Sequence, residues 1–389
     1  MKEEDESVSV LEQAATSEEP LAGETTGESQ ETGRGDRLQP IDSETRRRSG
    51  DVNSRFLYVV EQGAVLRRNS GHVQVTKGEN NLLEVPIVKL QGVLLYGNIQ
   101  VTTQCIRHLL DEGIWVSFLS RGGRYKGRLQ SPHDKGARLR RMQWQRSQDP
   151  DFCLEFGRAV VRGKLAGQMK VASAYAKNYL AQTLGEGHRI LKESVERLKD
   201  VDNLDELRGV EGNASRAYFD LFGRWNRSDL PFPGRHKRNA GDPINVLLNL
   251  GYTMVTRELE GLTESAGFDP AIGFYHLPDN DRPSLACDWI EEFRHVLVDR
   301  LVLKLINTSV IQPDDFEVHK DKGGVRIRPS GLRKFFDAYE KALTNRAEES
   351  ASAPGFRSIF LSRLAAMLES VVKGAPYKTH LEPQSIELD

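Results

Sequence analysis

The feature that most constrains the fold is a change in hydrophobic periodicity partway along the chain. Between residues 55 and 129 the apolar residues form short runs separated by turn residues, as at Asn69-Ser70-Gly71. From about Phe152 to residue 345 they recur at helical spacing instead. Short β-branched runs between Gly and Asn turns indicate antiparallel strands, and a 3.6-residue period indicates amphipathic helices. The sequence therefore predicts an α+β multi-domain protein in which a small β domain precedes an α-helical domain.

Residues 1–54 have a composition that separates them from both domains. They contain 14 Asp and Glu against 6 Lys and Arg, a net charge of −8, and few large apolar residues. Such a segment buries too little apolar surface to offset its chain entropy, so we predict a disordered acidic extension. A solvated tail explains its acidity more simply than mimicry of nucleic acid. The rest of the chain carries a net charge of +6, which permits a polyanionic partner.

Composition also excludes several classes of protein. No stretch approaches the ~18 consecutive apolar residues of a membrane helix, and the start MKEEDESVSV lacks the basic and apolar regions of a secretory signal. The cysteines Cys105, Cys153 and Cys287 have no CxxC spacing, so neither a disulfide framework nor a structural zinc site is predicted. These features predict a soluble cytoplasmic protein without a membrane partner.

The predicted β domain spans residues 55–145 and contains one helical insert. Thr102 or Thr103 can cap the segment QCIRHLLDEG, and Gly113 supplies its C-terminal stop. A hairpin then follows at RGGRYKGRL, and its basic side chains suit contact with phosphate and a solvated hairpin tip equally well. These basic residues are Arg121, Arg124, Lys126 and Arg128.

The predicted α-helical domain spans residues 146–345. The segment FGRAVVRGKLAGQMKVASAYAKNYLAQ indicates one long amphipathic helix, and LKESVERLKD indicates a second. Asp242-Pro243 combines an N-cap with a proline at the first position of a largely apolar, central helix. Ser284 is predicted to cap a shorter helix. Residues 346–389 are predicted to form a C-terminal helix, SIFLSRLAAMLESVV, and a flexible tail.

An acidic pair lies on the predicted helix that follows Ser284. Asp288 and Glu291 are three residues apart, so they project side by side next to the apolar stripe of this helix. His276, in the preceding loop, could fold back over its first turns. Two carboxylates and an imidazole suit Mg²⁺ or Mn²⁺ better than zinc. Spacing alone is weak evidence, because most Asp-x-x-Glu pairs are solvated or pair with basic residues such as Arg294.

A third carboxylate and a basic loop lie upstream of this pair. Glu211 precedes Gly212 in a helical segment whose small residues would let another helix approach closely. Taken alone, Glu211 is best explained as a charge that complements a helix dipole. The loop PFPGRHKRNAGDPIN carries Arg235 and Arg238 and leads into a helix. A basic loop of this kind suits contact with a DNA backbone.

Taken together, these segments resemble the CRISPR-associated integrase family, the endonucleases of the adaptation module that captures new spacers. The motifs Glu211-Gly212, Asp242-Pro243-Ile244-Asn245, Gly273-Phe274-Tyr275-His276 and Asp288-Trp289-Ile290-Glu291 occur in the order typical of that family. In the β part, the turn Leu95-Tyr96-Gly97-Asn98 agrees as well. The resemblance covers roughly residues 55–345, and several linked motifs in order are more specific than any one of them.

The resemblance implies a β-sandwich-like N-terminal domain, used for dimerisation and partner contacts, followed by an all-α catalytic domain. It also implies a homodimer that binds the small ferredoxin-like subunit of the adaptation complex. Glu211, His276 and Asp288 match the ligands of a divalent metal, Mg²⁺ or Mn²⁺, that the family uses. Glu291 matches the neighbouring acidic position of the catalytic set, as a ligand or as a helper.

By the same analogy, five residues would line the path of double-stranded and branched DNA. These are Arg235, Arg238, Lys164, Arg216 and Tyr218. The acidic extension before Arg55 departs from the family's usual pattern, and the resemblance assigns it no role.

The predicted reaction is metal-dependent strand transfer, in which a 3′-hydroxyl of a captured duplex attacks a phosphodiester at the edge of a CRISPR repeat. A general metal-dependent nuclease, a catalytically silent DNA-binding scaffold and a helical interaction protein are the alternatives. The sequence does not specify the repeat, the preferred metal, the length of captured DNA or the need for further subunits.

Overall fold

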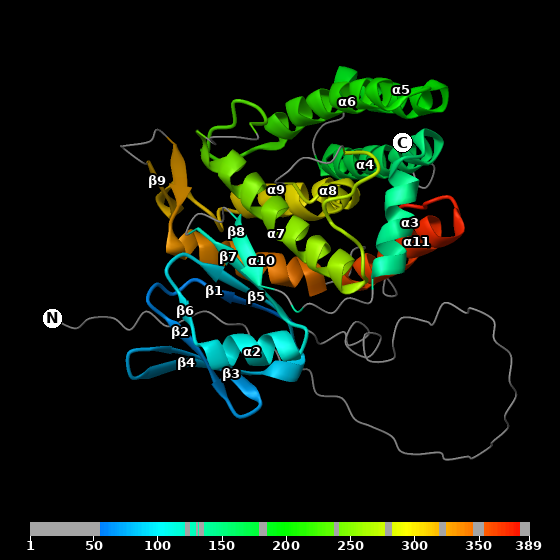
Figure 1. Cartoon of the computed structure of the whole chain (residues 1–389). Helices are drawn as coiled ribbons and strands as arrows, with labels where there is room; N and C mark the ends of the chain where they lie inside the picture. The colour runs from blue at the N-terminus through cyan, green and yellow to red at the C-terminus, as the bar shows by residue number, and fades with distance from the viewer. Residues whose placement is uncertain are drawn as a thin grey trace, which may run out of the picture.

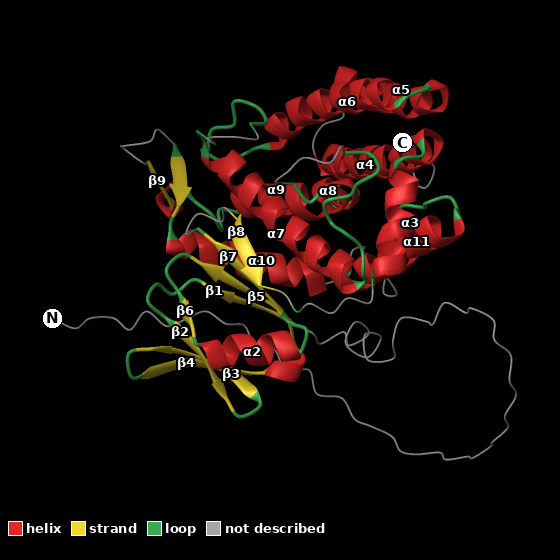
Figure 2. Cartoon of the chain, viewed as in Figure 1, coloured by secondary structure: helices red, strands yellow, loops and turns green. Residues whose placement is uncertain are grey.

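A computed structural model describes residues 55–120, 125–129, 131, 136–178, 185–236, 241–276, 282–318, 324–344 and 354–381. The predicted acidic extension, residues 1–54, lies outside this part of the chain. A β-rich N-terminal part packs beneath a helical C-terminal part (Figures 1 and 2). The mixed α+β class predicted from the change in periodicity is confirmed.

The β-rich part contains two four-stranded sheets in the described residues. The first has the order β1 (Arg55–Val59), β5 (Leu90–Tyr96), β7 (Trp115–Leu119), β8 (Tyr125–Leu129), and the second β4 (Asn80–Pro86), β3 (His72–Lys77), β2 (Val65–Asn69), β6 (Gln100–Val101). A short turn η1 (Ile87–Lys89) precedes β5, and helix α2 (Thr103–Asp111) follows β6. Buried side chains of both sheets and of α2 share one core, among them Leu57, Leu66, Val75, Val93, Leu109 and Val116.

The strand pairing is only partly antiparallel. The pairs β2–β3, β3–β4 and β7–β8 are antiparallel as predicted, but β1–β5, β5–β7 and β2–β6 are parallel. Parallel strands need long crossovers and are usually buried on both faces. Strand β5 meets this condition: Val93 and Leu95 point into the core of the β-rich part, and Leu94 and Tyr96 into the core of the helical part.

Local capping signals place two of the three predicted helix starts. Thr102 accepts a hydrogen bond from the Cys105 amide at 3.3 Å, and Asp242 accepts one from the Asn245 amide at 2.8 Å. The prediction that Ser284 is an N-cap is wrong by one position. Pro283 occupies the cap, and Ser284 is the first helical residue, fully buried.

The helical part is built from long helices around a core that includes α7. Its helices are α3 (Ala137–Ser147), α4 (Pro150–Asn178), α5 (Gly185–Arg197), α6 (Leu204–Trp225), α7 (Pro243–Ser265), α8 (Ser284–Ile290), α9 (Arg300–Asn307), α10 (Pro329–Thr344) and α11 (Phe356–Lys373). Short turns are η3 (Leu198–Asp200), the π-helical η4 (Arg294–Asp299) and η5 (Pro313–Asp315). The expectation of an all-α domain misses one hairpin, β9 (Phe316–Val318) with β10 (Val325–Ile327).

The C-terminal segment after α11 folds back onto the helical part. Gly374 ends α11 in the left-handed region, with φ of +71°. Beyond it Tyr377, Thr379 and Leu381 are buried. The prediction of a flexible tail is therefore wrong for residues 374–381, because Tyr377 stacks on Phe156 of α4 and Thr379 lies against Gly163 of the same helix. Residues 382–389 lie outside the described part.

Polar and aromatic contacts join the two parts. The Trp115 ring lies so close to Gly261 of α7 that a β-carbon there would meet its Nε1 at 2.4 Å. Arg128, predicted as a possible phosphate contact, instead pairs with Glu264 and, at 3.6 Å, with Glu260. Lys126 is exposed, whereas the other two basic residues of that hairpin, Arg121 and Arg124, lie outside the described residues.

Candidate active site

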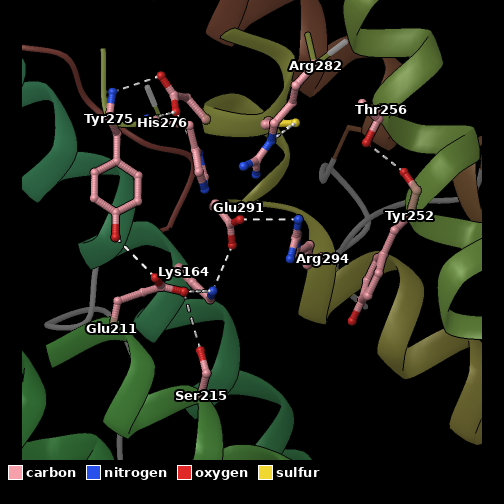
Figure 3. A network of polar contacts seen from close by, with 12 residues as sticks. Lys164, Glu211, Ser215, Tyr252, Thr256, Tyr275, His276, Arg282, Glu291 and Arg294 are labelled. Carbon is pink, nitrogen blue, oxygen red and sulfur yellow. Dashed lines mark hydrogen bonds and ion pairs between the residues drawn. The ribbon is translucent and has the colours of Figure 1, made fainter. Parts of the chain in front are cut away.

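The candidate site forms where α4 and α6 meet residues 273–276 and 282–294. Helix α4 supplies Lys164, α6 supplies Glu211, and the loop before α8 supplies His276 (Figure 3). Glu291 stands at the C-terminal cap of α8. Helices α4 and α6 pack against each other, so residues distant in the sequence reach one centre. Of the predicted site residues, Glu211 and Glu291 both reach Lys164 at this centre, and His276 lies beside Glu291 (Figure 3).

The Lys164 ammonium lies between two carboxylates at the centre of the site. Its Nζ contacts Oε1 of Glu211 and lies 2.8 Å from Oε2 of Glu291. Lys164 is only 4% exposed, and a buried ammonium needs such partners because its desolvation is costly. Glu211 also accepts hydrogen bonds from the Tyr275 hydroxyl at 3.1 Å and the Ser215 hydroxyl at 3.5 Å. The centre is thus a compact, charged cluster.

The charges of this cluster stabilise one another. Burial opposes ionisation of Glu291, but Arg294, Lys164 and His276 together hold the pKa of its carboxyl far below the ordinary value. Burial likewise opposes ionisation of Glu211, and Lys164 outweighs it, so the pKa of Glu211 is lowered. Burial also disfavours the ammonium, yet Glu291 and Glu211 raise the pKa of Lys164. Both carboxylates are therefore ionised at neutral pH and Lys164 is protonated.

Asp288 has a different environment from Glu291. Its Oδ2 accepts hydrogen bonds from the amides of Phe274 at 2.7 Å and Tyr275 at 3.0 Å. Its Oδ1 lies 2.7 Å from the His276 amide and 2.8 Å from the His276 ring nitrogen Nδ1. Asp288 is 0% exposed. Its carboxylate is therefore committed to the loop that carries His276.

This environment corrects the predicted ligand set. Asp288 was expected to bind the metal directly, but both of its oxygens already hold the loop. The contact with Nδ1 leaves Nε2 of His276 directed toward Glu291 (Figure 3). Glu211, His276 and Glu291 thus face the common centre, and Asp288 orients His276 from behind, as carboxylates often do for metal-binding histidines.

The donors at this centre fit a divalent metal by their chemistry. Two carboxylates and one imidazole form an oxygen-rich set that suits Mg²⁺ or Mn²⁺. Lys164 already shows that the pair of carboxylates accommodates a positive charge between them. In the described part of the chain, no three His, Cys, Asp or Glu side chains stand close enough together to form a ready-made metal cluster.

A second polar cluster, which the sequence did not reveal, lies beside the first. The π-helical turn η4 brings Nδ1 of His295 to 2.6 Å from Oδ2 of Asp299, and the Tyr252 hydroxyl donates to Oδ1 of Asp299. The Arg294 guanidinium lies 5.0 Å from the Tyr252 ring centroid and 3.3 Å from Oε1 of Glu291. Single-turn π-helices occur frequently at functional sites. The His-x-x-x-Asp spacing was the available signal for this cluster.

Two residues predicted to line the DNA path are buried instead. Tyr218 is 0% exposed, because its ring packs at 4.5 Å against the His295 ring and edge-on against Trp225. The prediction that Tyr218 contacts DNA is therefore wrong for this conformation. Lys164 is buried between its carboxylates rather than presented on the surface. It belongs to the charged cluster of the candidate centre.

The other predicted DNA contacts have different settings. Arg216 is exposed on α6. Arg235 is half-buried and donates to the side-chain oxygens of Asn245 at 2.9 Å and Asn249 at 2.7 Å. Arg238 lies outside the described residues. Of the five residues predicted to line the DNA path, only Arg216 and part of Arg235 therefore present positive charge at the described surface.

None of the described helices is both long enough and apolar enough to cross a lipid bilayer.

Comparisons with known proteins agree with this architecture. The chain is 31% identical over 292 residues to the CRISPR-associated endonuclease Cas1 1 of Chlorobaculum tepidum, an alignment that covers 73% of this chain and 85% of the relative. Its fold is similar to that of a casposase bound to integration product, with a TM-score of 0.72, 23% identity and coverage of 86% and 94% of the two chains.

The fold is also similar to that of a chain in a Cas6-RT-Cas1--Cas2 complex, with a TM-score of 0.73 and 24% identity. That match covers 85% of this chain but 36% of the other, so the chain spans about a third of that longer protein. The family model described as CRISPR associated protein Cas1 matches residues 57–341, a range that includes nearly all of the β-rich part and every residue of the candidate centre. The chain belongs to the Cas1 family of the CRISPR adaptation module.

Proposed function

We propose that this protein is a divalent-metal-dependent DNA endonuclease and integrase that inserts captured DNA into a CRISPR array. The observation that carries the proposal is that Glu211 and Glu291 meet at one buried positive charge, Lys164, while Asp288 holds His276 beside Glu291 (Figure 3). Carboxylates from separate helices, kept ionised and facing one centre, suit phosphodiester chemistry assisted by a cation. Membership of the Cas1 family supports the same assignment.

Each residue of the centre has a distinct task in this proposal. Glu211, Glu291 and Nε2 of His276 would hold Mg²⁺ or Mn²⁺. The bound metal supplies charge neutralisation at the phosphate and activation of the attacking hydroxyl. Asp288 keeps Nδ1 of His276 engaged, which fixes the orientation of the ring. Lys164 balances the two carboxylates when the site holds no other cation, and so preserves the geometry of the centre.

The proposed reaction is an in-line transesterification. The 3′-hydroxyl oxygen of the captured strand forms a bond to phosphorus, and the bond from phosphorus to the 3′-oxygen of the repeat strand breaks. The attacking hydroxyl loses a proton, and the leaving 3′-oxygen gains one. When water replaces the 3′-hydroxyl, the same site hydrolyses single-stranded or branched DNA. The fold shared with a casposase bound to integration product supports strand transfer as the main reaction.

The proposal extends to partners and location. We expect a homodimer that binds double-stranded and branched DNA together with a small ferredoxin-like adaptation subunit in the cytoplasm. The similarity in fold to a chain of a Cas1–Cas2 complex supports such an assembly.

A strand-transfer assay tests the proposed function. It combines the purified protein, its small partner, a short duplex and a repeat-containing plasmid, with Mg²⁺ or Mn²⁺ and with chelator. Joined, branched products that disappear with chelator are expected. Cleavage without joined products would indicate a general nuclease instead, and DNA binding without metal-dependent products would indicate a silent scaffold.

Variants of the centre sharpen the same assay. Glu211→Ala and His276→Ala should abolish joining while DNA affinity stays close to that of the wild type, because neither residue is among those proposed to contact the DNA backbone. Equal joining by both variants and the wild type would refute the assignment of this centre.

A further inference from the structure

The C-terminal segment, residues 374–381, lies beyond the match to the family model and packs behind the candidate centre. That match ends at residue 341. The Tyr377 hydroxyl donates a hydrogen bond to Oε1 of Glu292, and the His380 amide donates to Oε2 at 2.8 Å. Glu292 is 1% exposed and directly follows Glu291 in the chain. The segment therefore holds the backbone position next to a proposed metal ligand.

The same segment reaches the loop that carries His276 through aromatic contacts. The Tyr377 ring stacks on Phe156 of α4, with centroids 4.7 Å apart. Phe156 in turn packs edge-on against Phe274 at 4.8 Å. The Phe274 amide donates a hydrogen bond to Asp288 at 2.7 Å. Phe274 therefore links the ring contacts of Tyr377 to the hydrogen bonds that fix the loop.

A third contact places the segment against α4 beside Lys164. Gly163 has no side chain where Thr379 approaches, and a β-carbon there would meet Cβ of Thr379 at 2.8 Å. On the other side, Arg363 of α11 donates to the carbonyl oxygens of Lys378 at 2.8 Å and Thr379 at 3.3 Å. The segment is thus fastened to α4 and α11 at the level of the centre.

We propose that residues 374–381 form a C-terminal clamp that positions Glu291 and His276 for the reaction, with Tyr377 and Glu292 as its positioning residues. The inference rests on the proposed function for the chemistry, whereas the contacts stand independently of it. A buried carboxylate with two donors has little freedom to move, and Glu292 shares its backbone with Glu291. The clamp thereby restrains the end of α8, which carries Glu291, and the loop before it, which carries His276.

Tyr377→Phe tests the clamp because it removes the hydroxyl donor and keeps the ring stacked on Phe156. We expect faster hydrogen exchange of the amides of residues 274–276, with the rest of the helical part unchanged. Strand transfer and Mn²⁺ affinity should each fall about tenfold, the lower end of the range for losing a direct partner of a metal ligand, because Tyr377 acts through Glu292. Lys378→Ala is the matched control, since the Lys378 side chain is exposed and only its carbonyl oxygen contacts Arg363.

A second variant alters the contact between α4 and the clamp. Gly163→Ala forces Thr379 to shift, and we expect the same local rise in exchange and the same loss of activity. Gly209→Ala on α6 is its control, because a β-carbon there meets nothing within 4 Å. In each pair, one change alters a side-chain contact of the clamp and the other leaves those contacts in place.

The readouts separate failure of the clamp from failure of the proposed function. If the wild type shows no metal-dependent DNA activity, the proposed function fails, while hydrogen exchange still decides whether the clamp holds the loop. Wild-type exchange and wild-type rates in both Tyr377→Phe and Gly163→Ala would overturn the clamp. So would a uniform rise in exchange across the helical part, since that result indicates general destabilisation rather than positioning.

Discussion

The ring nitrogen Nδ1 of His276 lies 2.8 Å from Oδ1 of Asp288, and this contact gives the two acidic residues of the Asp-x-x-Glu pair different roles. Asp288 binds the loop with both carboxylate oxygens. Glu291 faces Lys164 at the centre. Asp288 and Glu291 are only three positions apart. Asp288 nevertheless positions the His276 imidazole, whereas Glu291 is available to a cation.

Exchanging each acid for its amide tests this division of roles. In Asp288→Asn one oxygen becomes a donor facing backbone amides, so we expect a disordered loop and strand transfer about 10- to 100-fold slower, with measurable Mn²⁺ binding retained. In Glu291→Gln we expect Mn²⁺ binding to be lost. Titration with Mn²⁺ and a strand-transfer assay provide the measurements, and Asp220→Asn on the exposed face of α6 is the control. Loss of Mn²⁺ binding in Asp288→Asn but not in Glu291→Gln would reverse the assignment.

Removing the buried ammonium should make folding depend on a divalent cation. Lys164→Met leaves the half-buried Glu211 and the buried Glu291 as two carboxylates without the ammonium between them. Breaking a buried pair in this way costs about 3–5 kcal/mol, so chemical denaturation without metal should show a loss of this size. Mn²⁺ should then raise the melting temperature of Lys164→Met more than that of the wild type. Lys192→Met, at an exposed position, should behave like the wild type. Equal Mn²⁺ stabilisation of the three proteins would contradict this role.

The change in periodicity and the local caps were enough to predict the class of fold. Thr102 and Asp242 cap their helices through short-range hydrogen bonds, which depend on neighbours in the sequence. The parallel pairing of β5 was not predictable in the same way, because it depends on a second buried face that only the helical part provides. The docking of Tyr377 onto Phe156 also requires contacts between distant segments.

The sequence indicated which acidic and histidine residues belong together, but not how they are arranged. The order of the motifs identified Glu211, His276, Asp288 and Glu291 together. Helical spacing places Asp288 and Glu291 on neighbouring positions of one face, so it cannot distinguish which of them the loop amides engage. Lys164 was predicted to contact DNA by analogy with the family. Its burial between two carboxylates follows from the packing of α4 on α6, which hydrophobic periodicity does not encode.

The junction between the two parts should give stability a measurable dependence on pH. Glu258 is buried and accepts hydrogen bonds from Tyr58 at 3.1 Å and Tyr339 at 3.2 Å. Burial raises its pKa from 4.5 to about 7, with Glu340 adding to the shift and Arg357 opposing it. Because the folded-state pKa is the higher one, the stabilising contribution of the protonated form is present below pH 4.5 and is lost as pH rises through 7.

Glu258→Gln tests this dependence because glutamine does not titrate. We expect the unfolding free energy of the wild type to fall relative to that of Glu258→Gln between pH 4.5 and about 7, by about 3 kcal/mol, and then to level off. Urea denaturation at several pH values measures the difference. A difference that stays constant over this range would show that Glu258 has an ordinary pKa.

The exposed and buried members of the predicted DNA path should respond differently to mutation. Arg216 is exposed on α6, so Arg216→Ala should weaken DNA binding uniformly across DNA sequences. It should also reduce the slope of log affinity against log salt concentration by about one. Tyr218→Phe keeps its ring in the core against His295, so DNA affinity should stay that of the wild type. Fluorescence anisotropy with a branched duplex at several salt concentrations measures both. A large loss of affinity in Tyr218→Phe with none in Arg216→Ala would mean that α6 exposes a different face when DNA binds.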